Sequence, residues 1–199
     1  MKRIFIPGIV VLFLLNGCLS FRATEYRITF DEKFKQGKIQ IIFEDIQSDH
    51  IQDPTKTDSL NINEIKRKRQ GDFDGLLEMI EDDESLLDAV EMGIYLKNRY
   101  LEEKDGHLNG YREGIFNNLK FDDEKESLRV LESEIVLNLK IDAEDDSVHT
   151  NGKLTGSGKY VCITWPKTEH ELYWKIVTKE SEEKSVSLID EYLKWKEKS

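Results

Sequence analysis

The stretch Glu134–Ile141, EIVLNLKI, decides the fold class. Ile135, Leu137, Leu139 and Ile141 recur at every second position, and alternate side chains of a strand point to the same side. Downstream, KYVCITW (159–165) and ELYWKIV (171–177) repeat this pattern, and Pro166 separates them. We therefore predict an antiparallel sheet in this half of the chain, with the alternating residues facing a core.

Two earlier regions carry the same signal. Apolar residues alternate over 26–30 and over 39–43, and the loop DEKFKQG joins them as a hairpin. From Ile94 onward the chain is again strand-like and contains Asp105-Gly106, a dipeptide that favours a tight hairpin turn. We expect one antiparallel sheet of about five to seven strands.

Two segments have a helical period instead. Residues 60–91 carry an apolar stripe at helical spacing, formed by Phe73, Leu76, Leu77 and Ile80. We expect Gly71 and Gly75 to break this segment into two pieces. A second helix is predicted at the C-terminus, capped by Ser181, with its stripe formed by Val186, Ile189, Tyr192 and Leu193. The fold class predicted is therefore α+β.

The first residues form a leader. Lys2 and Arg3 precede an apolar stretch from Ile4 to Leu15, and the chain turns polar directly after Ser20. A positive start, a short apolar middle and a small residue at the cut are features of a secretory signal. A spanning helix needs about 20 apolar residues, so this stretch is too short to cross a membrane. We therefore predict that residues 1–17 are a signal peptide.

Leu15-Asn16-Gly17-Cys18 resembles the lipobox of bacterial lipoproteins, although Asn16 stands where that family has Ala, Ser or Thr. The resemblance implies cleavage before Cys18, a diacylglycerol on its sulfur and acylation of the new amino group. Several acyl chains hold a protein stably on a membrane, whereas one chain holds it only marginally. Because the next residue is Leu19 rather than Asp, the resemblance favours the outer membrane and leaves its periplasmic or surface side open.

The lipobox also sets the expected domain organisation. Cys18 and residues up to 24 would form a short tether, and residues 25–199 a single α+β domain. Seven extended residues span at most roughly 25 Å, so the domain would lie close to the bilayer. With Cys18 acylated, Cys162 has no partner in the chain, and we expect it to be a small apolar side chain rather than a catalytic thiol.

The charge of the chain limits its partners. It has 29 basic and 40 acidic residues, a net charge of −11, and loss of Lys2 and Arg3 makes the mature chain more acidic. Such a surface disfavours nucleic acid and anionic lipid. The run Lys66–Arg69 is the exception. We interpret it as a solvated helix face, with docking to anionic headgroups as the alternative.

A short internal repeat relates 105–110 (DGHLNG) to 151–156 (NGKLTG). The second copy continues as NGKLTGSGKYV and resembles a membrane occupation and recognition nexus (MORN) repeat. The matching residues are Asn151, Gly152, Lys153, Gly156, Gly158 and Tyr160. Such arrays need several stacked units, and this chain has no array, so we interpret the repeat as shared turn chemistry.

No metal or cofactor site is predicted. Asp105, His107 and Asn109 imitate the start of a calcium loop, but its twelfth position is Phe116 instead of Glu. The histidines (His50, His107, His149 and His170) form no zinc motif, and three acidic clusters (82–84, 122–124 and 144–146) are expected to be solvated turns. No nucleophile or phosphate-loop motif occurs, so the sequence does not indicate an enzyme.

Three aromatic residues surround the last strand pair. By their parity, Trp165 and Trp174 should point into the core and Tyr173 to the opposite face, where an aromatic ligand-binding shelf is the alternative to simple packing. The sequence as a whole predicts a lipid-anchored envelope protein that binds or scaffolds another envelope component, protein or glycan. The alternatives are a periplasmic hydrolase using unidentified carboxylates and a surface protein that contacts host molecules.

Overall fold

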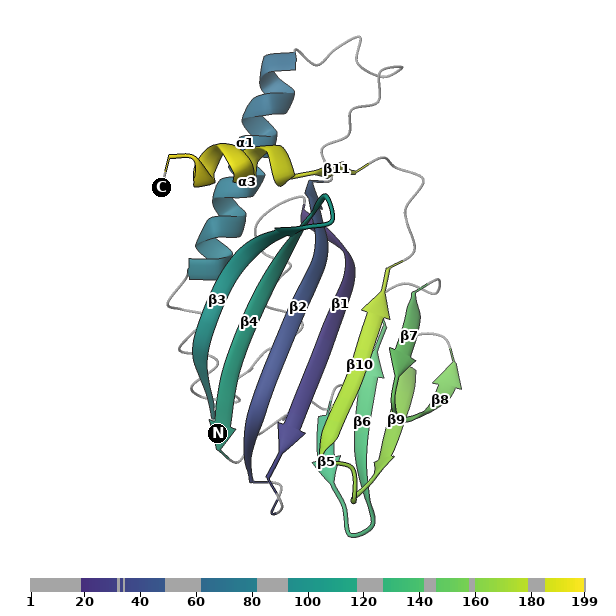
Figure 1. The fold of residues 1–199 in the computed structure, drawn as a ribbon. Coiled ribbons are helices and arrows are strands. Elements are labelled where there is room, and N and C mark those ends of the chain that lie inside the picture. Colours follow the sequence, from purple (N-terminus) through teal and green to yellow (C-terminus); the bar gives the residue numbers. More distant parts are fainter. Residues whose placement is uncertain are drawn as a thin grey trace, which may run out of the picture.

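The structure is a computed structural model. It describes residues 19–31, 33, 35–48, 62–81, 93–117, 127–141, 146–157, 160–178 and 185–198. Two antiparallel sheets and two helices make up this part of the chain, which confirms the α+β class (Figure 1).

The larger sheet, sheet A, has the strand order β3-β4-β2-β1-β10-β7, and a short strand β11 also pairs with β2. Its strands are β1 (Leu19–Phe30), β2 (Gln36–Ser48), β3 (Ile94–Lys104), β4 (His107–Asn117), β7 (Ser147–Thr150), β10 (Glu171–Val177) and β11 (Val186–Ser187). Sheet B has the order β5-β6-β9-β8 and was not predicted as a separate sheet. Its strands are β5 (Ser127–Val130), β6 (Glu134–Lys140), β8 (Lys153–Ser157) and β9 (Tyr160–Pro166). The helices are α1 (Ile62–Glu81) and α3 (Ile189–Lys196).

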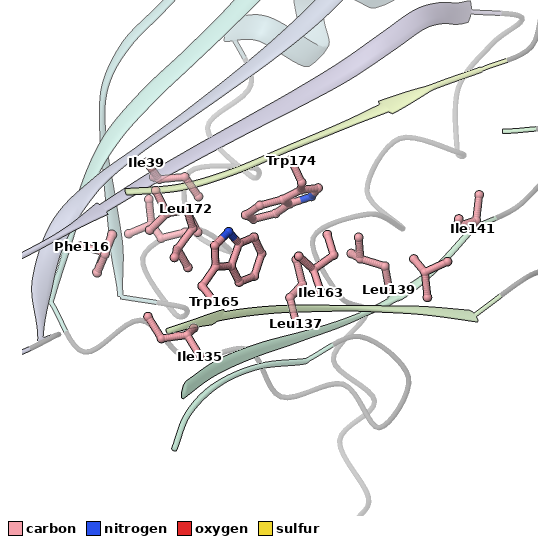
Figure 2. Close-up of a cluster of buried hydrophobic side chains, with 13 residues drawn as sticks. Ile39, Phe116, Ile135, Leu137, Leu139, Ile141, Ile163, Trp165, Leu172 and Trp174 are labelled. Carbon is pink, nitrogen blue, oxygen red and sulfur yellow. The ribbon is translucent and has the colours of Figure 1, made fainter. Parts of the chain in front are cut away.

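Sheet B packs on one face of sheet A. The predicted core face of β6, formed by Ile135, Leu137 and Leu139, meets Leu172 and Trp174 of β10 (Figure 2). Ile141, directly after β6, and Ile28 of β1 belong to the same cluster. Trp165 and Trp174 are 1% and 3% exposed, so their prediction as core residues is confirmed. We call this apolar cluster the sandwich core.

The helices cover the rest of the same face of sheet A. Phe43 and Ile46 of β2 pack against Phe73 and Leu76 of α1, and α3 adds Tyr192. We call this cluster the helical core. Ile41, midway along β2, contacts both cores, and β1 also gives residues to each of them. The two cores therefore share the central strands β1 and β2.

The hairpin predicted at Asp105-Gly106 is confirmed. β3 and β4 pair up to Lys104 and His107, and φ is 55° at Asp105 and 81° at Gly106. Two successive positive φ values define the type I′ turn that suits the twist of a two-residue hairpin. The hairpin predicted from β1 to β2 is also confirmed.

Two predictions about the ends of elements are wrong. Residues 19–24, expected in the tether, belong to β1 and pair with β2. The C-terminal helix begins at Ile189, after Val186 has paired in β11, and Leu193 is 43% exposed rather than part of the buried stripe. Ser181, its expected cap, lies outside the described residues and eight positions before the helix.

One prediction about glycines is also wrong. Residues 62–81 form one helix through Gly71 and Gly75, because burial of its apolar stripe outweighs the local cost of glycine. The turn expected at Asn151 and Gly152 is present, but it does not join two strands of one hairpin. These two residues form the corner at which the chain passes from β7 in sheet A to β8 in sheet B.

Candidate functional site

The candidate site is the face of sheet A opposite both cores, which we call the open face. The described helices and sheet B all lie on the other side of the sheet. Two neighbouring hollows open on this face, with volumes of about 630 and 510 Å³. Arg27 of β1 lines both hollows, which makes the two a continuous surface.

The first hollow contains a balanced set of charges. Its lining includes the cations Arg22, Arg27, Lys104 and Lys175 and the anions Glu25, Glu44, Asp45 and Asp105. Most of these have defined partners. Lys175 Nζ lies 2.5 Å from Glu44 Oε2, and Arg27 Nε donates to Glu25 Oε1 at 2.7 Å. The Glu25 bond raises the pKa of the Arg27 guanidinium, which therefore stays charged.

Asp45 and His107 form a third pair in this hollow. Asp45 has φ of 51°, is 7% exposed, and receives a hydrogen bond on Oδ2 from Gln47 Nε2 at 2.8 Å. Its backbone N–H donates to Asn109 Oδ1 at 2.9 Å. His107 Nδ1 lies 3.0 Å from Asp45 Oδ1, so the carboxylate has a hydrogen-bond donor there when Nδ1 carries a proton.

The positive φ at Asp45 explains how the hollow forms. Phe43 and Ile46 both point into the helical core, although strict alternation would place them on opposite faces. The irregularity at residues 44–45 changes the parity of β2 and brings the Asp45 side chain to the open face. A positive φ in a non-glycine residue is uncommon, and such positions cluster at functional sites.

The second hollow is built around Glu113 of β4. Gln40 Nε2 donates to Glu113 Oε1 at 2.7 Å, and Asn98 Nδ2 donates to Oε2 at 2.9 Å. These two hydrogen bonds, the one from Asn98 first, hold the pKa of Glu113 below its ordinary value. Three adjacent strands thus present a fixed array of amide and carboxylate groups.

Tyrosines border both hollows. On β3, Tyr95 and Tyr100 are 47% and 41% exposed, and Tyr100 stacks on Tyr111 of β4 with ring centroids 4.7 Å apart. On β10, Tyr173 lies on the open face as predicted, with the Arg27 guanidinium 5.3 Å from its ring centroid. Burial raises the pKa of Tyr111 and of Tyr173, so both remain neutral hydroxyls. The open face therefore offers flat rings beside charged groups and amides whose positions are fixed.

Several residues singled out in the sequence lie elsewhere. Cys18, the predicted lipidation site, lies outside the described residues, as do His50, the acidic clusters 82–84 and 122–124 and most of 144–146. Among described residues, no group of three or more His, Cys, Asp or Glu side chains could hold a metal ion. Cys162 is a free, half-buried thiol in β9.

The structure gives the MORN-like stretch a packing role. Asn151 Oδ1 accepts from Trp165 Nε1 at 2.6 Å and from the Tyr173 N–H at 3.0 Å, so this side chain joins the two sheets. Tyr160, at the other end of the match, is 57% exposed on sheet B. These residues do not converge on the open face.

The basic run Lys66–Arg69 divides into two parts. Lys66 and Arg67 are exposed on α1. Arg69 is buried, and its Nη2 donates to Glu191 Oε2 of α3 at 2.8 Å and to the Ser187 carbonyl at 3.1 Å. The run is therefore partly a structural link between the helices and partly a cationic surface.

Sequence reasoning missed most of the open face. His107 and Asn109 were noticed, but only as a failed calcium loop, and Glu25, Asp45 and Glu113 were not singled out. Strand parity placed Tyr173 on this face and could have placed Glu25 there, because Glu25 alternates with the apolar Tyr26 and Ile28. Glu113 stands between Arg112 and Gly114, so no apolar alternation marks it. The irregular position at Asp45 leaves no mark of this kind in the sequence.

Comparison with known proteins does not assign the chain to a family. No protein-family model, curated protein or solved structure matches it. None of the described helices is long and apolar enough to span a bilayer.

Proposed function

We propose that the protein is a lipid-anchored binding module of the bacterial envelope and that the open face of sheet A binds a glycan. One observation carries the proposal. A sheet face outside both cores holds two adjoining hollows in which carboxylates, amides and cations are already fixed by hydrogen bonds. Polar groups fixed before binding lower the cost of ordering them around a ligand.

The chemistry of this face favours a hydrophilic ligand over a protein surface. The core of a protein–protein interface is depleted of charged residues, whereas eight of the fourteen residues lining the first hollow are Asp, Glu, Lys or Arg. Its four cations and four anions balance, so a strongly charged polymer gains no net attraction there. Neutral hydroxyl and amide groups fit this alternation of donors and acceptors, and exposed rings such as Tyr95 and Tyr100 can stack on sugar faces.

The position of β1 supports the membrane attachment. Leu19, the residue after Cys18, is the first residue of β1. An acylated Cys18 would therefore hold sheet A against the bilayer with no spacer between them, because consecutive Cα atoms are about 3.8 Å apart. Mass spectrometry of the mature protein tests this part of the proposal, and an unmodified Cys18 or an intact leader would contradict it.

Glycan binding is tested by co-sedimentation of the detergent-solubilised protein with purified peptidoglycan. Tyr100→Ala should lower the bound fraction, because it removes a ring from the edge of the open face. Tyr160→Ala is the matched control, since this tyrosine is also exposed but lies on sheet B. Equal effects of the two substitutions, or no sedimentation of the unmodified protein, would contradict the proposal.

A second candidate function rests on Asp45 and His107. A carboxylate that orients an imidazole Nδ1 leaves Nε2 available as a general base, as in hydrolases. If the protein hydrolyses a glycan or an ester, His107→Gln should abolish formation of the hydrolysis product without weakening ligand binding. Unchanged amounts of product with this variant, or none from the unmodified protein, would exclude the hydrolase.

A further inference from the structure

Helices α1 and α3 meet at the end of sheet A at which β1 begins. Leu19 of β1 pairs with Ser48 of β2, and Ser48 pairs on its other side with Val186 of β11. Adjacent strands lie about 4.8 Å apart, so Leu19 lies roughly 10 Å from the segment that leads into α3. In Figure 1, α3 crosses α1 at this end of sheet A. We define the helical end as the surface formed by residues 63–70 of α1 and residues 189–198, which comprise α3 and the turn after it.

The charge of the helical end is opposite to that of the chain. Its unburied cations are Lys66, Arg67, Lys68, Lys194, Lys196 and Lys198. The unburied carboxylates of the same segments are Glu64, Asp190 and Glu197. The buried Arg69 and Glu191 neutralise each other. The surface is therefore cationic in a protein whose net charge is −11.

Apolar side chains are also exposed at the helical end. Leu193 is 43% exposed, and Trp195 is 37% exposed while its ring packs at 6.4 Å from that of Phe73. Tryptophan and lysine together favour the boundary between lipid headgroups and hydrocarbon, since the ring is amphipathic and the ammonium attracts anionic headgroups.

We propose that the helical end of the folded domain rests on the bilayer and binds anionic phospholipid headgroups. This inference relies on the proposed anchor at Cys18, which would place the acyl chains beside this end. Lipid anchorage and headgroup binding then reinforce each other, because acyl chains inserted in the bilayer keep the helical end at a high local concentration near the headgroups. The orientation also places the first hollow, which includes Arg22, near the membrane.

The three tryptophans permit a direct test with the full lipidated protein. Trp165 and Trp174 are almost fully buried, so a quencher carried by lipid can reach only Trp195. The protein is reconstituted into vesicles of phosphatidylcholine with or without phosphatidylglycerol, each containing a headgroup-labelled nitroxide lipid. We expect loss of most of the Trp195 emission in anionic vesicles and much less in zwitterionic ones. Trp195→Phe identifies the residue responsible by removing the quenched signal.

Matched charge variants test the surface itself. Lys194→Gln with Lys198→Gln should reduce the quenching in anionic vesicles to the zwitterionic level. Lys153→Gln in β8 with Lys167→Gln in the turn after β9 removes the same charge far from the helices and should leave the quenching unchanged. A protein that floats with vesicles but shows no quenching, or quenching independent of lipid charge or of Lys194 and Lys198, overturns the docking and leaves the anchor intact. A protein that does not float at all overturns the anchor, and the docking with it.

Discussion

At Gly152, directly before β8, a side chain would collide with core side chains of the neighbouring strand β9. A Cβ there would lie 2.6 Å from Trp165 Nε1 and 2.8 Å from Ile163 Cγ2, whereas one at Gly71 on α1 would meet nothing within 4 Å. We predict that Gly152→Ala lowers the free energy of unfolding by about 1–3 kcal/mol, since overpacking forces buried groups to shift. Gly71→Ala should raise it by about 0.5–1 kcal/mol, because alanine favours a helix. Urea unfolding measures both, and equal effects would contradict this account.

The ionisation of Glu113 gives a second prediction at this scale. The hydrogen bonds from Asn98 and Gln40 stabilise the carboxylate, so its pKa is lowered in the folded protein. The stability that Glu113 contributes is therefore full above its unfolded pKa and is lost as the pH falls through the lower folded value. NMR titration of the Glu113 carboxyl carbon should give a midpoint below that of a glutamate in an unfolded peptide. Asn98→Ala should raise that midpoint, and an unchanged midpoint would contradict the assigned cause.

The sequence could predict single side chains where alternation was regular. Trp165, Trp174 and Tyr173 lie on the faces that their parity indicated. Asn151 was expected only to turn the chain, yet it accepts hydrogen bonds from Trp165 and Tyr173, which lie 14 and 22 residues away. Partners at that distance cannot be read from a local pattern.

At the scale of elements, the segment from β11 to α3 stabilises the helical core through its buried side chains. Leu188, which precedes α3, is fully buried, and the Tyr192 hydroxyl donates to the Leu101 carbonyl of β3 at 3.1 Å. Leu188→Ala should therefore lower the free energy of unfolding by about 2–5 kcal/mol through the cavity it leaves. Leu193→Ala on the same segment is the control and should change it by less than about 0.5 kcal/mol, because this side chain is 43% exposed. Thermal and urea unfolding measure the two variants, and similar losses would show that burial of Leu188 is not the cause.

Element types were easier to predict than element ends. The stripe of Phe73, Leu76 and Ile80 correctly indicated a helix, and all three side chains are buried. The start of α3 was predicted wrongly because Val186 satisfies a helical period and a strand pattern equally well. Val186 is in a strand because it pairs with Ser48 of β2, and that contact is between residues far apart in the sequence.

For the molecule as a whole, the sequence predicted the class but not the division into two sheets. Strands β6 and β9 of sheet B alternate in the same way as β10 of sheet A. Alternation shows which residues of a strand face a core, but not which sheet the strand joins. The site was missed for a related reason, because the open face unites side chains from strands far apart in sequence, such as Gln40 and Glu113.

The sandwich core and the helical core should unfold together. Strands β1 and β2 are 12 and 13 residues long and run through both cores, so neither core can open without breaking the central pairing of sheet A. In the variant Trp195→Phe, fluorescence reports only Trp165 and Trp174 in the sandwich core, whereas circular dichroism reports mainly α1 and α3. We predict coincident urea midpoints for the two signals, as two-state unfolding requires. A lower midpoint by circular dichroism would contradict this prediction, since it would show that the helices leave sheet A while the sandwich remains folded.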